Sequence, residues 1–181
     1  MKRTIMFAGA VLFAALSAAS AQEPTFAKPG PEHAELKKIE GTWDAVMKMA
    51  QAPEPMPAVG IYKMECDGMW LASDFKMDVP GFKFTGKGLD GYDQKKKKYV
   101  SLWVDSMSSA PMQMEGTHDA ATKTTTLTGE AIGDSGKLEK FKTVTKMTDD
   151  DHMHFEMLMV GEGGKDTSAF TIEYTRRKAA K

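Results

Sequence analysis

Short stretches in which apolar and polar residues alternate follow one another along most of this chain, from Trp43 to Arg176. Successive side chains of a β-strand point to opposite faces, so each stretch predicts a strand with one buried face. In the last stretch, Phe170, Ile172 and Tyr174 occupy alternate positions, and polar residues stand between them. This period of two makes β-structure the main component of the predicted fold.

One segment, residues 31–40, has helical character instead. Pro31 suits the first turn of a helix, Leu36 and Ile39 can share one face, and Gly41 suits the position just past the end. About ten strand segments follow, joined by local turns. Such a meander avoids exposed sheet edges by closing on itself, whereas a Greek-key sandwich needs long cross-connections. We therefore predict an all-β fold, an antiparallel up-and-down β-barrel of about ten strands with a short N-terminal helix.

Turn signals separate the strand segments. Asp67-Gly68 is the strongest hairpin signal, because glycine tolerates the positive φ that tight hairpin turns require. The lysine run 95–98 predicts a solvated hairpin tip rather than a binding patch. Residues 53–57 include three prolines, which cannot donate ladder hydrogen bonds, and they predict a loop at the barrel mouth. A strand is expected over residues 82–89.

The N-terminal residues have the features of a secretory signal peptide. Lys2 and Arg3 are positive, residues 5–16 are apolar, and residues 19–21 are small, as at a cleavage site. The apolar run is too short to span a membrane. We therefore expect an exported protein, periplasmic or extracellular. The expected organisation is a signal peptide at 1–21, a flexible leader at 22–30, a single barrel domain at 31–177 and a tail at 178–181.

Charge and cysteine content exclude a nucleic-acid-binding protein and a disulfide-stabilised one. The chain without its signal peptide has 22 Lys and Arg against 25 Asp and Glu, which is not the footprint of a nucleic-acid-binding protein. Cys66 is the single cysteine, so no intramolecular disulfide can form. Its place in an alternating stretch predicts a buried, inert thiol. The sequence does not predict an oligomeric state.

The first and last strands of the predicted barrel together carry a recognisable pattern. Gly41 and Trp43 open the first strand directly after the helix, and Arg176 lies at the end of the last strand. This combination resembles the lipocalins and the wider calycin superfamily. The resemblance implies that Arg176 packs across the Trp43 ring at the closed end, as a cation–π contact. The two residues are therefore predicted to close the barrel, with the ligand mouth at the opposite end.

A closer resemblance covers nearly all of the chain after the signal peptide. The chain is similar to a bacterial family of exported domains of unknown function. The resemblance implies a calycin-like fold but no established activity, so no catalytic residues are carried over. The motifs that carry it are Pro31-Glu32-His33-Ala34-Glu35-Leu36, Gly41-Thr42-Trp43, Gly91-Tyr92-Asp93, Trp103-Val104-Asp105 and Tyr174-Thr175-Arg176.

Methionine is unusually frequent, with 15 in 181 residues and 13 after the signal peptide. Several occur two positions apart on presumed inward faces, and methionine adapts its shape to varied ligands. We therefore predict a barrel that binds a small, largely apolar ligand in its lumen, without a cofactor. The residues predicted to contact the ligand are Tyr62, Met64, Phe84, Trp103, Met114, Phe155, Met157 and Tyr174.

The alternative function is an extracytoplasmic metal-handling protein. Thioether sulfur is a soft ligand for Cu(I), and His152 and His154 share one strand face. The more apolar face of that strand carries Met153 and Phe155, so both histidines are expected to point to solvent. The same orientation disfavours a haem held by a histidine of this strand, as in nitrobindin-like barrels.

Catalysis is not predicted, although an enzyme on a calycin scaffold stays open. Gly133-Asp134-Ser135-Gly136 resembles the nucleophile tetrapeptide of chymotrypsin-like serine proteases, but a hairpin turn is the better interpretation. Asp93 and Asp105 stand near predicted turns, where carboxylates are usually solvated.

Overall fold

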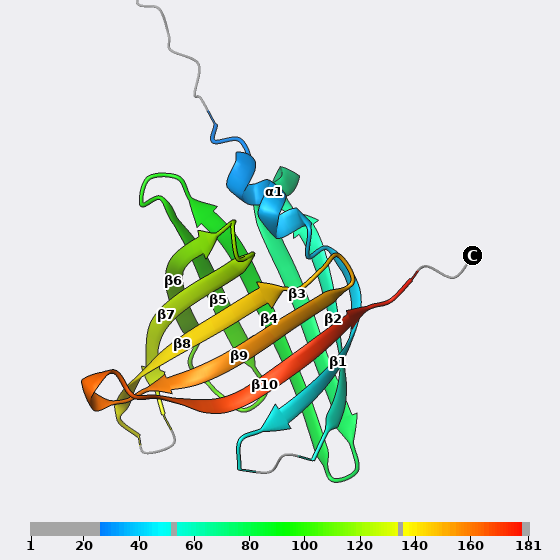
Figure 1. The fold of residues 1–181 in the computed structure, drawn as a ribbon, viewed down its shortest axis with the longest axis vertical. Helices are drawn as coiled ribbons and strands as arrows, with labels where there is room; N and C mark the ends of the chain where they lie inside the picture. Colours follow the sequence, from blue (N-terminus) through cyan, green and yellow to red (C-terminus); the bar gives the residue numbers. More distant parts are fainter. Residues whose placement is uncertain (1–25, 52–53, 134–135, 179–181) are drawn as a thin grey trace, which may run out of the picture.

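The computed structural model describes residues 26–51, 54–133 and 136–178 of the chain. It shows a closed barrel of ten antiparallel strands with one α-helix at one end (Figure 1), which confirms the predicted fold. Each strand pairs with its neighbours in sequence, and pairing of the first strand with the last closes the barrel. The elements are α1 (Pro31–Lys37), β1 (Gly41–Met49), β2 (Met56–Glu65), β3 (Trp70–Val79), β4 (Phe82–Asp93), β5 (Lys98–Asp105), β6 (Met112–Asp119), β7 (Thr124–Ile132), β8 (Leu138–Met147), β9 (His152–Val160) and β10 (Asp166–Arg176), with 3₁₀ turns at Cys66–Gly68 and Glu162–Gly164.

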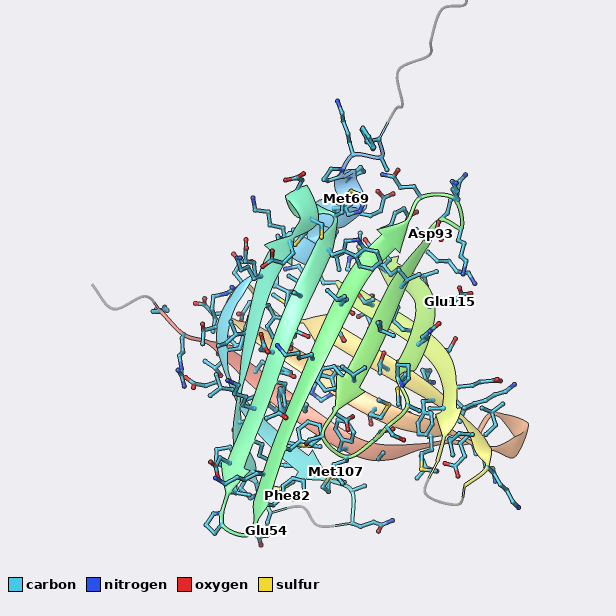
Figure 2. All side chains as sticks on the ribbon, turned by 180° about the vertical axis from the view of Figure 1, so that it is seen from behind. Glu54, Met69, Phe82, Asp93, Met107 and Glu115 are labelled. Carbon is cyan, nitrogen blue, oxygen red and sulfur yellow. The ribbon has the colours of Figure 1, made fainter. Side chains whose placement is uncertain are left out.

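The helix defines one end of the barrel. Figure 2 shows Met69 and Asp93 at the α1 end, and Glu54, Phe82 and Met107 at the opposite end. Within the described residues, no helix is long and apolar enough to cross a membrane.

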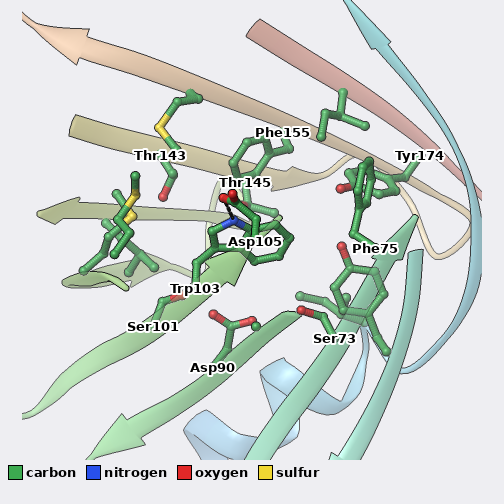
Figure 3. Close-up of a pocket in the computed structure, with 18 of the residues that line it drawn as sticks. Ser73, Phe75, Asp90, Ser101, Trp103, Asp105, Thr143, Thr145, Phe155 and Tyr174 are labelled. Carbon is green, nitrogen blue, oxygen red and sulfur yellow. Dashed lines mark hydrogen bonds between the residues drawn. The ribbon is translucent and has the colours of Figure 1, made fainter. Parts of the chain in front are cut away.

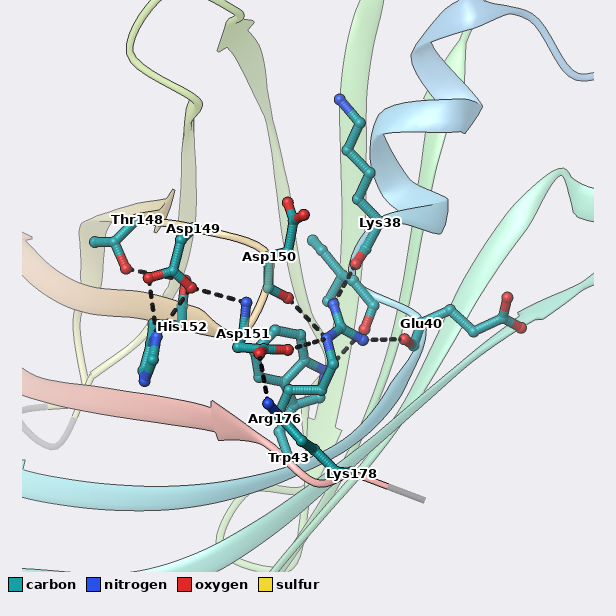
Figure 4. A network of polar contacts seen from close by, with 11 residues as sticks. Lys38, Glu40, Trp43, Thr148, Asp149, Asp150, Asp151, His152, Arg176 and Lys178 are labelled. Atoms are coloured by element: carbon teal, nitrogen blue, oxygen red, sulfur yellow. Dashed lines mark hydrogen bonds and ion pairs between the residues drawn. The ribbon is translucent and has the colours of Figure 1, made fainter. Parts of the chain in front are cut away.

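Arg176 and Trp43 meet where α1 joins β1, as the sequence predicted. The Arg176 guanidinium carbon lies 4.0 Å from the centroid of the Trp43 ring, and Trp43 is fully buried. The guanidinium also donates to the carbonyls of Lys38, Glu40 and Asp150, at 2.6, 2.5 and 2.8 Å (Figure 4). One side chain of β10 thus holds the end of the helical segment, the start of β1 and the β8–β9 loop together.

The glycines of β4 make room for a large aromatic side chain. A Cβ on Gly86 would lie 2.1 Å from the Trp103 ring, and a Cβ on Gly88 would lie 3.3 Å from it. The indole therefore packs on the inner face of β4, where only glycine at positions 86 and 88 leaves enough room for it.

Two local predictions are corrected, one for Pro57 and one for Cys66. Strand β2 begins at Met56, so Pro57 lies within it rather than in a loop. Pro57 stands opposite Val46 of β1, whereas pairing with β3 begins only at Ala58, so the proline lies at a strand end that is unpaired on one side. Pro53 lies outside the described residues. Cys66 is exposed rather than buried, because it starts the 3₁₀ turn with a φ of 52° instead of continuing the strand.

The other turns agree with the sequence. The lysine run forms the tip between β4 and β5, where the Asp93 carboxylate accepts the backbone N–H groups of Lys95 and Lys96. Gly133 and Gly136 form the turn between β7 and β8 with a 2.9 Å backbone hydrogen bond. Asp134 and Ser135, between them, lie outside the described residues.

Candidate functional site

The barrel is hollow. Its lumen holds a cavity of about 620 Å³ that extends from Leu36 and Ile39, beneath α1, to Phe82 and Met107 at the opposite end. The lining is mainly apolar, because the alternation of each strand turns its apolar residues inward. Nine methionines line the cavity: Met47, Met49, Met56, Met77, Met107, Met112, Met114, Met153 and Met157.

Seven of the eight residues predicted to contact a ligand line this cavity. They are Tyr62, Phe84, Trp103, Met114, Phe155, Met157 and Tyr174. Whether they contact a ligand stays a prediction.

The exception is Met64, which is not among the lining residues. It packs on the small core formed by Leu36, Leu71 and Tyr99 at the helical end. Its N–H donates to the Glu40 carboxylate at 3.1 Å, so this part of β2 belongs to the closure under α1. Alternation along β2 predicts the face of Met64 correctly but not the depth at which α1 fills the barrel.

A hydrogen bond to Asp105 holds the Trp103 indole in place near the mouth of the barrel. The indole Nε1 donates to an Asp105 carboxylate oxygen at 2.9 Å (Figure 3). The other oxygen accepts the N–H groups of Met107 and Ser108, at 2.8 and 3.1 Å. Asp105 is therefore both the turn residue that the sequence indicates and the anchor of the largest aromatic side chain in the lumen.

A polar group that the sequence did not predict lies nearer α1. Asp90 points into the lumen from β4, and Ser73 and Ser101 point in from the neighbouring strands (Figure 3). Burial raises the pKa of the Asp90 carboxyl to about 6, and a hydrogen bond with the Ser101 hydroxyl offsets part of that rise. β4 continues to Asp93 instead of stopping at residue 89, and this extension carries Asp90 inside.

Two tyrosines, Tyr62 of β2 and Tyr174 of β10, lie close enough to this carboxylate to feel its charge. Tyr62 and Tyr174 contact each other edge to face, with ring centroids 6.3 Å apart. Burial raises the pKa of Tyr62 to about 12 and that of Tyr174 well above 10, and the negative charge of Asp90 adds to both rises. Both phenols are therefore neutral hydrogen-bonding groups at physiological pH.

The two histidines of β9 lie outside the lumen, as their alternation predicts. His152 contacts the Asp149 carboxylate at 2.9 Å, and His154 contacts Glu173 at 2.6 Å. Within the described residues, no group of three or more His, Cys, Asp and Glu side chains is arranged to hold a metal ion. Metal binding by methionine sulfur stays a prediction.

A second hollow of about 590 Å³ lies at the helical end, below the C-terminal part of α1. Its lining mixes acidic and basic side chains, among them Glu35, Lys38, Lys123 and Asp150. Since charges of both signs face each other there, this hollow has no clear preference for a ligand.

Comparison with known proteins places the chain in a family. No curated protein matches it. Its fold is similar to that of Rv2717c from M. tuberculosis, with a TM-score of 0.59 and 10% identity over 82% of this chain and 99% of the other. It is also similar to the S-type phycobiliprotein lyase CPES from Guillardia theta, with a TM-score of 0.51 and 10% identity over 84% and 100%. At such identity the similarity shows the fold alone. The model of the family described as "Protein of unknown function (DUF1579)" matches residues 28–176, and the chain belongs to this family.

Proposed function

We propose that this protein binds a small, largely apolar molecule in the lumen of its barrel. The observation that carries the proposal is the lumen itself, a cavity of about 620 Å³ with a mainly apolar lining. Small-molecule sites commonly have volumes of about 300–1,000 Å³, apolar walls and a few polar groups that orient the ligand. Asp90, Ser73 and Ser101 are such polar groups in this lumen.

The methionines give the lumen a lining that adapts. Methionine has an unbranched, flexible side chain, and its sulfur is easily polarised, so a wall of methionines repacks around ligands of different shape. Phe75, Phe84 and Phe155 supply more rigid surfaces beside them. A lining of this composition supports binding of apolar molecules of more than one shape.

A protein named as a phycobiliprotein lyase has a similar barrel, and this is an analogy at the level of the fold alone. We also propose that the protein acts outside the cytoplasm, on the basis of the signal-peptide features of residues 1–21. Fractionation of the source cells, followed by mass determination of the protein, tests export and cleavage together.

Uptake of a neutral apolar dye tests the proposed function. N-phenyl-1-naphthylamine is titrated into the purified protein, and saturable fluorescence enhancement at a stoichiometry near one is expected. Met157 faces the lumen, so Met157→Trp fills part of it and should weaken dye binding about tenfold or more. Leu158→Trp makes the matching change at the next position of β9, which faces outward, and should bind dye like the wild type.

The proposal is wrong if the wild-type protein takes up no dye. It is also wrong if Leu158→Trp weakens dye binding as much as Met157→Trp while both variants remain folded, because the dye would then bind outside the lumen.

A further inference from the structure

The charged groups that face the lumen are of one sign. Asp90 and Asp105 line the cavity, and none of the described lining residues is Lys, Arg or His. A charge in an apolar cavity is poorly solvated, so its interaction with an entering ligand is stronger than the same interaction in water. The lumen therefore discriminates among ligands by charge as well as by shape.

The two carboxylates differ in how many hydrogen bonds they accept from the protein. Asp105 accepts N–H groups from Trp103, Met107 and Ser108, so its charge is already compensated at the mouth. Asp90 has the hydroxyl of Ser101 as its hydrogen-bond partner and lies deeper, in register with Leu71. Of the two, Asp90 is the carboxylate with remaining capacity to accept a hydrogen bond from a ligand.

The polar side chains around Asp90 are uncharged. Ser73 comes from β3, Ser101 from β5, and the phenols of Tyr62 and Tyr174 come from β2 and β10. All four are neutral at physiological pH. A ligand carboxylate placed here would face a like charge, with no Lys, Arg or His among the described lining residues, which disfavours fatty acids and similar anions.

We propose that the ligand is an apolar molecule that carries a basic nitrogen, which lies against the Asp90 carboxylate at the α1 end of the lumen. Its apolar body extends past the Trp103 indole toward the mouth. A protonated amine supplies both the hydrogen bond that Asp90 lacks and the opposite charge that the lumen lacks. This inference rests on the proposed function and assigns the chemical class of its ligand.

Displacement of bound N-phenyl-1-naphthylamine by three molecules of equal chain length tests the inference. Decylamine, decanol and decanoate differ only in head group, and all are used below their micelle concentrations at about pH 7.5. Decylamine should displace the dye at a concentration at least about tenfold lower than decanoate, with decanol between them, as expected for a hydrogen bond to a charged group. Equal displacement by amine and acid, or stronger displacement by the acid, overturns the inference and leaves the proposed function intact.

Asp90→Asn removes the charge and keeps the shape of the side chain. It should abolish the preference for decylamine over decanol. Both competitors are compared within the same variant, so a change in dye affinity does not alter that comparison. Asp74→Asn is the matched control, because Asp74 lies on the outer face of β3 and pairs with Lys87 in solvent; it should keep the preference. A preference that survives Asp90→Asn overturns the assignment to Asp90.

The same preference should depend on pH. At about pH 5 Asp90 is mostly protonated, so the amine should lose most of its advantage over the alcohol, while Tyr62 and Tyr174 stay neutral throughout. This measurement needs no variant, so it decides the inference even where Asp90→Asn fails to fold. If the dye itself does not bind, the proposed function fails and the inference fails with it.

Discussion

Asp90 lies on the inner face of β4, in register with Leu71 on one side and Ser101 on the other. Its pKa of about 6 in the folded protein is above the 3.8 of an ordinary aspartate, so folding disfavours its ionised form. An acidic residue held in this way lowers stability at neutral pH. Such a cost at a cavity wall is typical of a residue kept for binding rather than for folding.

The sign of this effect gives a pH-dependent prediction for Asp90→Asn. Between about pH 4 and pH 6 the folded wild-type protein binds more protons than the unfolded chain, so its free energy of unfolding falls as pH rises through this range. At about pH 7.5 the variant should therefore be more stable than the wild type by up to about 3 kcal/mol, and at about pH 4 that advantage should almost disappear. Urea unfolding at the two pH values measures the difference.

Asp74→Asn serves as the control for this measurement, since Asp74 lies on the outside of the same sheet. Its effect on the free energy of unfolding should be small at neutral pH. An advantage of Asp90→Asn that is equal at both pH values would show that the Asp90 carboxyl is not buried in the way described.

At the scale of elements, β10 and the segment around α1 act as one closing unit. Arg176 stacks on Trp43 and donates to three carbonyls, while the Trp43 indole donates to the Ile39 carbonyl at 2.8 Å. A lysine in place of Arg176 has a single charged nitrogen and cannot reproduce this planar set of contacts. The closing unit fixes the helical end, and the lumen extends from there toward the mouth.

Trp43→Ala tests that division between closure and binding. Removing a fully buried indole should lower the free energy of unfolding by about 3–5 kcal/mol, measured by chemical denaturation. The fraction that remains folded should still bind N-phenyl-1-naphthylamine. Val46→Ala, at an exposed position of the same strand, should cost less than about 1 kcal/mol. Loss of dye binding without loss of stability would mean that the two ends of the barrel are assigned the wrong way round.

Considered as a whole molecule, this is a barrel whose fully buried core is gathered around Trp43, Phe75 and Tyr174, with a hollow beside it. The hollow leaves apolar surface that the chain itself does not cover. A ligand buried in the lumen would therefore add stability that the free protein lacks.

A saturating lumen ligand should raise the melting temperature. At a concentration about 100 times its dissociation constant, a ligand that binds only the folded state stabilises by about 2.7 kcal/mol. Differential scanning calorimetry with N-phenyl-1-naphthylamine should show this rise for the wild type and a smaller one for Met157→Trp. A melting temperature that does not change at saturation would contradict binding to the folded barrel.

Much of the fold follows from local sequence patterns. Alternation predicts which face of β9 carries Phe155 and Met157 and which carries His152 and His154, because the direction of a side chain depends only on its position along the strand. The contact of Arg176 with Trp43 is what the resemblance to calycins implies, and pairing of β1 with β10 brings the two residues together.

Other features depend on packing between elements. Met64 has the predicted orientation, but α1 and Leu71 fill the barrel at its level, so it lies outside the cavity. Asp90 follows a glycine-rich stretch and resembles a turn residue, yet pairing with β3 and β5 on both sides keeps β4 extended to Asp93.

The sequence by itself determines that this chain forms an antiparallel barrel with an apolar interior, because alternation and local turns are properties of neighbouring residues. Only the tertiary structure decides that the interior is hollow, that its volume is about 620 Å³ and that Asp90 stands inside it with no Lys, Arg or His among the described lining residues. The physical reason is that the volume and charge of a lumen are sums over side chains from every strand, and those sums depend on the register that closure imposes.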